Sequence, residues 1–153
     1  MMVMTAKVNF KKIALLLGAL ALVVIALGML LGGRAQPTSA AAVSDNDARV
    51  KFLEHFGWQV SAAPVESGQV KIPAEQSDVF SRYARLQESQ GYDLAPYAGK
   101  TVMRYVYQIT NYPDAAHPVY ATLLVHKNQV IGGDITDTGP QGKIHGFTMP
   151  GKE

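Results

Sequence analysis

A run of uncharged, apolar residues near the N-terminus constrains this chain more than any other feature. The run extends from Ile13 to Leu31 and reads IALLLGALALVVIALGMLL. A helix of that length spans about 28 Å, close to the roughly 30 Å hydrocarbon core of a bilayer. The run has no polar stripe, which a helix on the surface of a soluble domain would need. It therefore predicts a membrane-spanning helix, with the lipid bilayer as the first expected partner.

The flanking charges give this helix an orientation. Lys7, Lys11 and Lys12 precede the run, whereas only Arg34 follows it closely. Positive charge marks the cytoplasmic side of single-pass proteins, so the N-terminus is expected in the cytoplasm and the rest of the chain outside. The predicted organisation in the cell membrane is a cytoplasmic basic tail at 1–12, a transmembrane helix at 13–31, a linker at 32–43 and an extracytoplasmic domain at 44–153.

A cleaved signal peptide is the alternative interpretation of the N-terminus. Ala40-Ala41-Ala42 offers small residues typical of a cleavage site. However, the apolar region of a signal peptide is usually about 7–15 residues long, which is shorter than this run. An uncleaved anchor is therefore favoured. The chain has no cysteine, which excludes a lipoprotein anchor and any disulfide.

The outer part of the chain is slightly acidic. Four of the 14 Lys and Arg residues flank the apolar run, and all 12 acidic residues lie beyond it. The outer domain thus carries ten basic and 12 acidic side chains, a net charge of −2. No basic stripe with interleaved aromatic residues is present, so nucleic acid is not an expected partner.

The outer domain begins with an amphipathic helix. Ser44 and Asp47 resemble a capping box, and Phe52 and Phe56 recur at helical spacing, which predicts a helix at 45–56. The further expected elements are strands at 58–60 and 69–72 around a turn at 66–68, a helix from Pro73 to Gln90, and strands at 101–111, 119–126 and 129–136, with a bulge at Gly132-Gly133. This order predicts an α+β domain of two layers, with two helices packed on an antiparallel sheet of about five strands.

Short motifs spread over the outer domain resemble those of a known family. The motifs are Phe52-Leu53 with Gly57-Trp58-x-Val60, Val70-x-Ile72-Pro73, Leu86-Gln87, Gly91-Tyr92-Asp93-Leu94, Tyr97-x-Gly99-Lys100, Arg104-Tyr105-x-Tyr107, Asn111-Tyr112-Pro113, Ile131-Gly132-Gly133-Asp134 and His145-Gly146-Phe147. They resemble an uncharacterised domain-of-unknown-function family of single-pass membrane proteins from clostridia-like Firmicutes. The resemblance implies a place in the bacterial cell envelope and transfers no activity or site residue.

Tyrosines in the predicted strands are the main candidates for a binding site. Tyr105 and Tyr107 alternate along the strand at 101–111, so they share one face, and Tyr120 lies in the strand at 119–126. If the two faces coincide, the three rings form an aromatic patch that a partner could contact. Packing of the same rings under the helices is the other interpretation, and the favoured one.

No motif in the chain points to catalysis, a metal or a cofactor. There is no His pair at metal-ligand spacing, no EF-hand loop, no phosphate-binding loop and no Gly-x-Ser-x-Gly elbow. We therefore expect a non-enzymatic envelope domain that binds a protein, a peptide or a cell-wall component. The alternative is a small hydrolase or metal-dependent enzyme that uses His126, Asp134, Asp137 and His145.

Overall fold

The computed structural model describes residues 41–151, which form one unit. The predicted cytoplasmic tail, the transmembrane helix and most of the linker lie outside the described residues. Within 41–151, no helix has both the length and the apolar character needed to cross a membrane.

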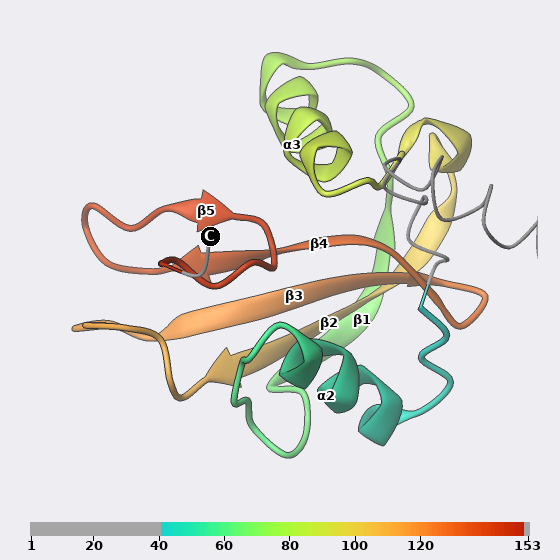
Figure 1. The fold of residues 1–153 in the computed structure, drawn as a ribbon. Helices are drawn as coiled ribbons and strands as arrows, with labels where there is room; N and C mark the ends of the chain where they lie inside the picture. The colour runs from blue at the N-terminus through green and yellow to red at the C-terminus, as the bar shows by residue number, and fades with distance from the viewer. Residues whose placement is uncertain (1–40, 152–153) are drawn as a thin grey trace, which may run out of the picture. The chain divides into compact units, whose positions relative to one another are not determined.

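Five antiparallel strands form one sheet in which each strand pairs with the next along the chain (Figure 1). They are β1 (Glu66–Lys71), β2 (Thr101–Ile109), β3 (Val119–His126), β4 (Gln129–Asp137) and β5 (Ile144–His145). Two α-helices, α2 (Asn46–His55) and α3 (Asp78–Ser89), and a short 3₁₀ helix, η1 (Ala95–Tyr97), complete the described part. The prediction of an α+β domain with two helices and a five-stranded antiparallel sheet is confirmed.

The helices begin later than the sequence suggested. The N-cap of α2 is Asp45, whose carboxylate accepts a hydrogen bond from the Ala48 amide at 2.8 Å, and not Ser44. The N-cap of α3 is Ser77, so the helix does not begin at Pro73. Both corrections have the same cause, because a short oxygen-bearing side chain placed to satisfy a free amide decides where a helix starts.

The N-terminal strands also differ from the prediction. Residues 66–68, expected as a turn, belong to β1, and the expected strand at 58–60 is reduced to a single bridge between Val60 and Ile109. The strand β5 was not predicted, because two residues are too few to show an alternating pattern.

The β3–β4 hairpin has a tight turn and the bulge that the sequence predicts near Gly132. The turn residues Lys127 and Asn128 have φ angles of 47° and 63°, the combination of a type I′ turn. The pairing register shifts between Leu124 and Val125, so β4 carries one extra residue next to the two glycines.

The two helices cover opposite faces of the sheet (Figure 1), which corrects the expectation of two layers. Helix α2 packs on the face that presents Tyr107 and Leu123, whereas Phe80 and Tyr83 of α3 pack on the face that presents Leu124. Successive residues of β3 from Ala121 to Val125 are buried, and all but Thr122 are apolar, which is typical of a strand covered on both sides.

Gln90, at the C-terminal cap of α3, joins three parts of the chain. Its Oε1 accepts a hydrogen bond from the Phe147 amide at 2.7 Å, and its Nε2 donates to the Gly133 carbonyl at 3.1 Å. We expect Gln90→Met to lower the free energy of unfolding by about 1–3 kcal/mol, because both backbone groups lose their partner. Urea unfolding of the full chain, followed by the fluorescence of its single tryptophan, measures this. Gln69→Met on the exposed strand β1 is the matched control and should change stability by less than about 0.5 kcal/mol.

Candidate functional site

One half of the sheet face under α3 is open. Helix α3 covers the half that contains Leu124 and Ile131. Beside α3, the face is hollowed into two adjoining pockets of about 360 and 470 Å³, which share Arg104, Thr122 and Thr136, and Phe80 and Tyr83 of α3 line the smaller one. We call this surface the sheet-face cleft, and its other main lining residues are Val65, Val106, Tyr120, Asp134 and Ile144.

Asp134 forms a polar floor in the cleft. Its side chain is buried, with 6% exposed, and each carboxylate oxygen accepts a hydrogen bond. The Tyr83 hydroxyl donates to Oδ2 at 3.0 Å, and the Thr136 hydroxyl donates to Oδ1 at 2.7 Å. A carboxylate placed this way can accept a further hydrogen bond from a ligand, because each oxygen has two lone pairs.

Burial dominates the ionisation of this floor. It raises the pKa of the Asp134 carboxyl, while the hydrogen bonds from Thr136 and Tyr83 and the positive charge of Arg104 act in the opposite direction. Burial and the neighbouring Asp134 carboxylate also raise the pKa of Tyr83, so its hydroxyl stays protonated and remains a donor.

The ionisation of Asp134 makes the free energy of unfolding depend on pH in a testable way. Because the pKa of Asp134 is higher in the folded than in the unfolded state, its favourable contribution is complete at low pH and is lost as pH rises through the folded pKa. We expect Asp134→Asn to remove this loss, so the variant should gain stability relative to wild type as pH rises above about 4, the ordinary pKa of an aspartate in an unfolded chain. Urea unfolding across this range measures the difference.

Tyr83→Phe provides the complementary variant for the same experiment. It removes a hydrogen bond that favours the charged carboxylate, so the stability of this variant should fall more steeply with pH than that of wild type. Parallel pH profiles for wild type and Asp134→Asn would contradict the assignment of a raised pKa to this side chain.

The rim of the cleft combines one ion pair with exposed aliphatic side chains. Arg104 on β2 forms a salt bridge with Glu66 on β1. Val65 and Ile144 are 54% and 60% exposed, and both line the cleft. Exposed aliphatic residues around a hollow are typical of a surface that another molecule covers.

The three candidate tyrosines do not form one patch. Tyr105 pairs with Leu123 and Tyr107 with Ala121, whereas Tyr120 pairs with Gln108. Directly opposed residues of antiparallel strands share a face, so Tyr120 lies on the face opposite to the other two. Only Tyr120, among these three, lines the cleft.

Helix α2 covers the other two tyrosines. Tyr107 is fully buried, and its hydroxyl accepts from Arg49 Nε at 2.9 Å and donates to Asn46 Oδ1 at 3.0 Å. The Arg49 guanidinium lies 3.9 Å from the centroid of the Tyr105 ring. The favoured interpretation, packing under a helix, thus holds for Tyr105 and Tyr107.

The four residues of the enzyme alternative lie apart. His145 pairs with Ile135 and so faces away from Asp134, its ring packs against Tyr112, and His126 packs against Tyr97. Asp137 accepts a hydrogen bond from the Gly139 amide. Within residues 41–151, no group of three His, Cys, Asp or Glu side chains is placed to hold a metal ion.

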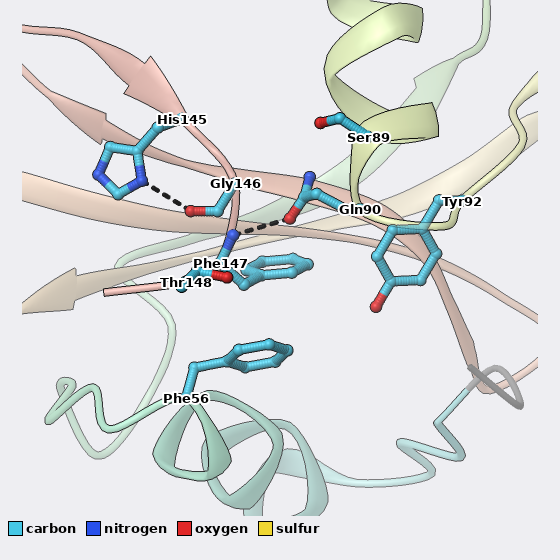
Figure 2. A pocket seen from close by; sticks show the side chains of 8 residues that line it. All are labelled: Phe56, Ser89, Gln90, Tyr92, His145, Gly146, Phe147 and Thr148. Atoms are coloured by element: carbon cyan, nitrogen blue, oxygen red, sulfur yellow. Dashed lines mark hydrogen bonds between the residues drawn. The ribbon is translucent and has the colours of Figure 1, made fainter. Parts of the chain in front are cut away.

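A second hollow, of about 360 Å³, lies between the C-terminal ends of both helices and the segment after β5 (Figure 2). Its lining includes the rings of Phe56, Tyr92 and Phe147 and the imidazole of His145. The His145 Nδ1–H donates to the Gly146 carbonyl at 2.7 Å, and its Nε2 lies 3.2 Å from the Tyr112 hydroxyl. Both ring nitrogens of His145 therefore have partners within the domain.

Sequence reasoning missed most of the cleft. Tyr83 lies in the predicted helix without a signal of its own, and Arg104 stands out in the sequence only within a family motif. A signal was present, because Arg104 and Thr122 are polar residues between apolar neighbours in their strands, and Thr136 follows Ile135. It could be interpreted only once the register placed these residues on the same face.

The described residues define an α+β domain whose antiparallel meander leaves one cleft open on a sheet face. Residues 52–135, from α2 to β4, match the family described as "Domain of unknown function (DUF4830)", and the chain belongs to this family. The resemblance to a domain-of-unknown-function family is thereby confirmed. No curated protein and no solved structure matches the chain.

Proposed function

We propose that the chain is a membrane-tethered, extracytoplasmic binding domain whose sheet-face cleft receives an apolar segment of another protein. The observation that carries this proposal is the uncovered half of the sheet face, with aliphatic residues exposed at its rim and a buried carboxylate in its floor. The opposite face of the same strands is packed under α2, so the open surface is confined to one side of the sheet.

The chemistry of the cleft suits an extended protein segment. Val106 and Ile144 offer apolar contact, and Thr122 and Thr136 offer hydroxyl groups. Asp134 is an acceptor and Arg104 a donor, the two groups that pair with peptide N–H and C=O groups. A few polar groups placed within an apolar hollow orient a ligand, while burial of the apolar surface supplies most of its affinity.

The position of the cleft suits a tethered domain. The first described residues run beside the β3–β4 hairpin, since the Val43 amide donates to the Asn128 carbonyl at 2.7 Å. Tyr120 and Thr136 lie at the other end of these two strands, about 20 Å away along β3. The chain therefore enters the described domain at the end remote from the open half of the cleft.

Photo-crosslinking in cells tests the cleft. A benzophenone amino acid replaces the exposed Ile144 in the full chain, and the matched control carries it at the exposed Lys51 on α2. We expect Ile144 to yield a discrete crosslinked protein band that Lys51 does not yield, and Tyr120→Ala to weaken that band several-fold. A cleft that yields no band, or the same bands as Lys51, contradicts the proposal.

The tether has its own test. We expect the native chain to remain in the membrane fraction after alkaline carbonate extraction and to retain residues 1–40 in its measured mass. Protease added to spheroplasts should digest the outer domain and leave the N-terminal tail. A shorter, extractable protein would favour the signal-peptide alternative.

A further inference from the structure

The chain joins the described domain at a fixed point. Ala42 forms an antiparallel bridge with Gln129, and the Val130 amide donates to the Ala41 carbonyl at 3.1 Å. Val43, the next residue, is fully packed in the core. The segment that leads into the domain is thus held beside the β3–β4 hairpin, at the start of β4 (Figure 1).

Basic and aromatic side chains gather at the same end of the sheet. The centroid of the Tyr97 ring lies 5.3 Å from the centroid of the His126 ring. The Nζ atom of Lys100 lies 5.6 Å from the same Tyr97 centroid. Lys127 is exposed in the hairpin turn, and Lys71 is exposed at the end of β1, paired with Thr101. We call this set, Lys71, Tyr97, Lys100, His126 and Lys127, the basic end.

Two carboxylates close in sequence to this end have backbone partners. Asp45 accepts a hydrogen bond from the Ala48 amide and Asp93 from the Ala95 amide, each at 2.8 Å. Neither makes a salt bridge with the lysines of the basic end. The exposed Glu75 also lies near this end, since Ala74 lies beside Gly99, but among residues 41–151 no salt bridge joins it to these lysines. The three ammonium groups are therefore available to an external anion.

The length of the linker limits how far this end can lie from a membrane. Nine residues, 32–40, separate the predicted transmembrane segment from Ala41. Fully extended, they span about 30 Å. We infer that the basic end rests on anionic lipid headgroups, an inference that depends on the proposed membrane tether. Lysines are attracted to anionic lipid surfaces, and tyrosine rings partition into the headgroup region, so the chemistry of this end matches that surface.

Spin labelling can test this inference, because the chain has no cysteine. Ala98→Cys places a nitroxide on an exposed site beside the basic end, and Ala115→Cys places one on an exposed site in the β2–β3 loop at the opposite end. The full chain is reconstituted in nanodiscs of phosphatidylcholine, with or without phosphatidylglycerol, that also contain a nickel-chelating lipid. We expect phosphatidylglycerol to raise nickel-induced relaxation at Ala98→Cys several-fold and to leave Ala115→Cys unchanged.

Charge-reversed variants separate a specific surface from general attraction. Lys100→Glu with Lys127→Glu should abolish the rise at Ala98→Cys. Lys51→Glu with Lys143→Glu changes the net charge equally at exposed sites outside the basic end and should preserve it. For a chain that stays in the nanodisc, two results overturn the inference. One is an equal loss of the relaxation rise at Ala98→Cys with both charge-reversed pairs, and the other is no rise in relaxation when phosphatidylglycerol is added. A chain that does not remain with the nanodisc overturns the tether as well.

Discussion

Gly133→Ala is expected to destabilise the domain by about 3 kcal/mol and to lower its Tm by about 10–20 °C. A methyl group built on Gly133 would lie 2.1 Å from the Thr122 carbonyl oxygen and 2.5 Å from Cζ of Phe147. The first neighbour is backbone of the central strand and the second is a fully buried ring, so neither can move cheaply. The substitution must therefore distort β4 or expel the C-terminal segment from the core.

Gly68→Ala is the matched control for this substitution. Gly68 also lies within a strand, but nothing is within 4 Å of the position that its methyl group would take. We expect a change of less than about 0.5 kcal/mol. Both variants are measured in the full chain by thermal and urea unfolding, with the fluorescence of Trp58 as the probe. Equal stability of the two variants would contradict the close approach of Phe147 to β4.

Trp58→Ala should cost about 4 kcal/mol, within the range for truncating a large buried aromatic residue. Trp58 is fully buried, stacks on Tyr112 with parallel rings at 5.7 Å, and donates from Nε1 to the Phe147 carbonyl at 2.6 Å. Truncation leaves a cavity and removes the partner of a buried carbonyl. The unfolding transition is followed by pulse proteolysis, because this variant lacks the fluorescent probe.

Trp58→Phe separates the two contributions. It retains most of the apolar contact and loses the indole N–H, so we expect a smaller cost of about 1–3 kcal/mol. Tyr112→Phe serves as a control on the other ring of the stack, since it keeps the packing and removes only the hydroxyl that meets His145. If Trp58→Phe were as stable as wild type, the bond from Nε1 to Phe147 would contribute nothing to stability.

Both large effects converge on Phe147, which the sequence placed only inside a family motif. Its ring packs against Phe52 of α2, against the C-cap residue Phe56 and against Tyr92, at centroid distances of 5.3, 5.3 and 6.2 Å. Its backbone binds Trp58 and Gln90. A residue after the last strand therefore fastens α2, α3 and the sheet together. These contacts join residues far apart along the chain, and no local pattern reveals them.

The class of fold followed from local patterns. Runs rich in β-branched and aromatic residues, bounded by turn residues, predicted β2, β3 and β4 to within two residues, because such side chains favour an extended, partly buried backbone. Helical spacing and the glycines that follow predicted both helices, since these signals act within a few residues. The helix starts were misplaced, because the geometry of an N-cap leaves no periodic pattern. The strand β5 was missed, because a strand of two residues is too short to show one.

The candidate site depended on register. Local patterns determine neither which face of β3 lies on the same side as which face of β2 nor which side of the sheet each helix covers. A shift of one residue in pairing moves every side chain to the other face, and the pairing of Tyr107 with Ala121 places Tyr120 on the open side. The sequence by itself determined the elements, the charge distribution and the apolar N-terminal run. Only the tertiary structure decided which polar residues meet in the cleft, because strand register and helix placement are set by packing across the whole core.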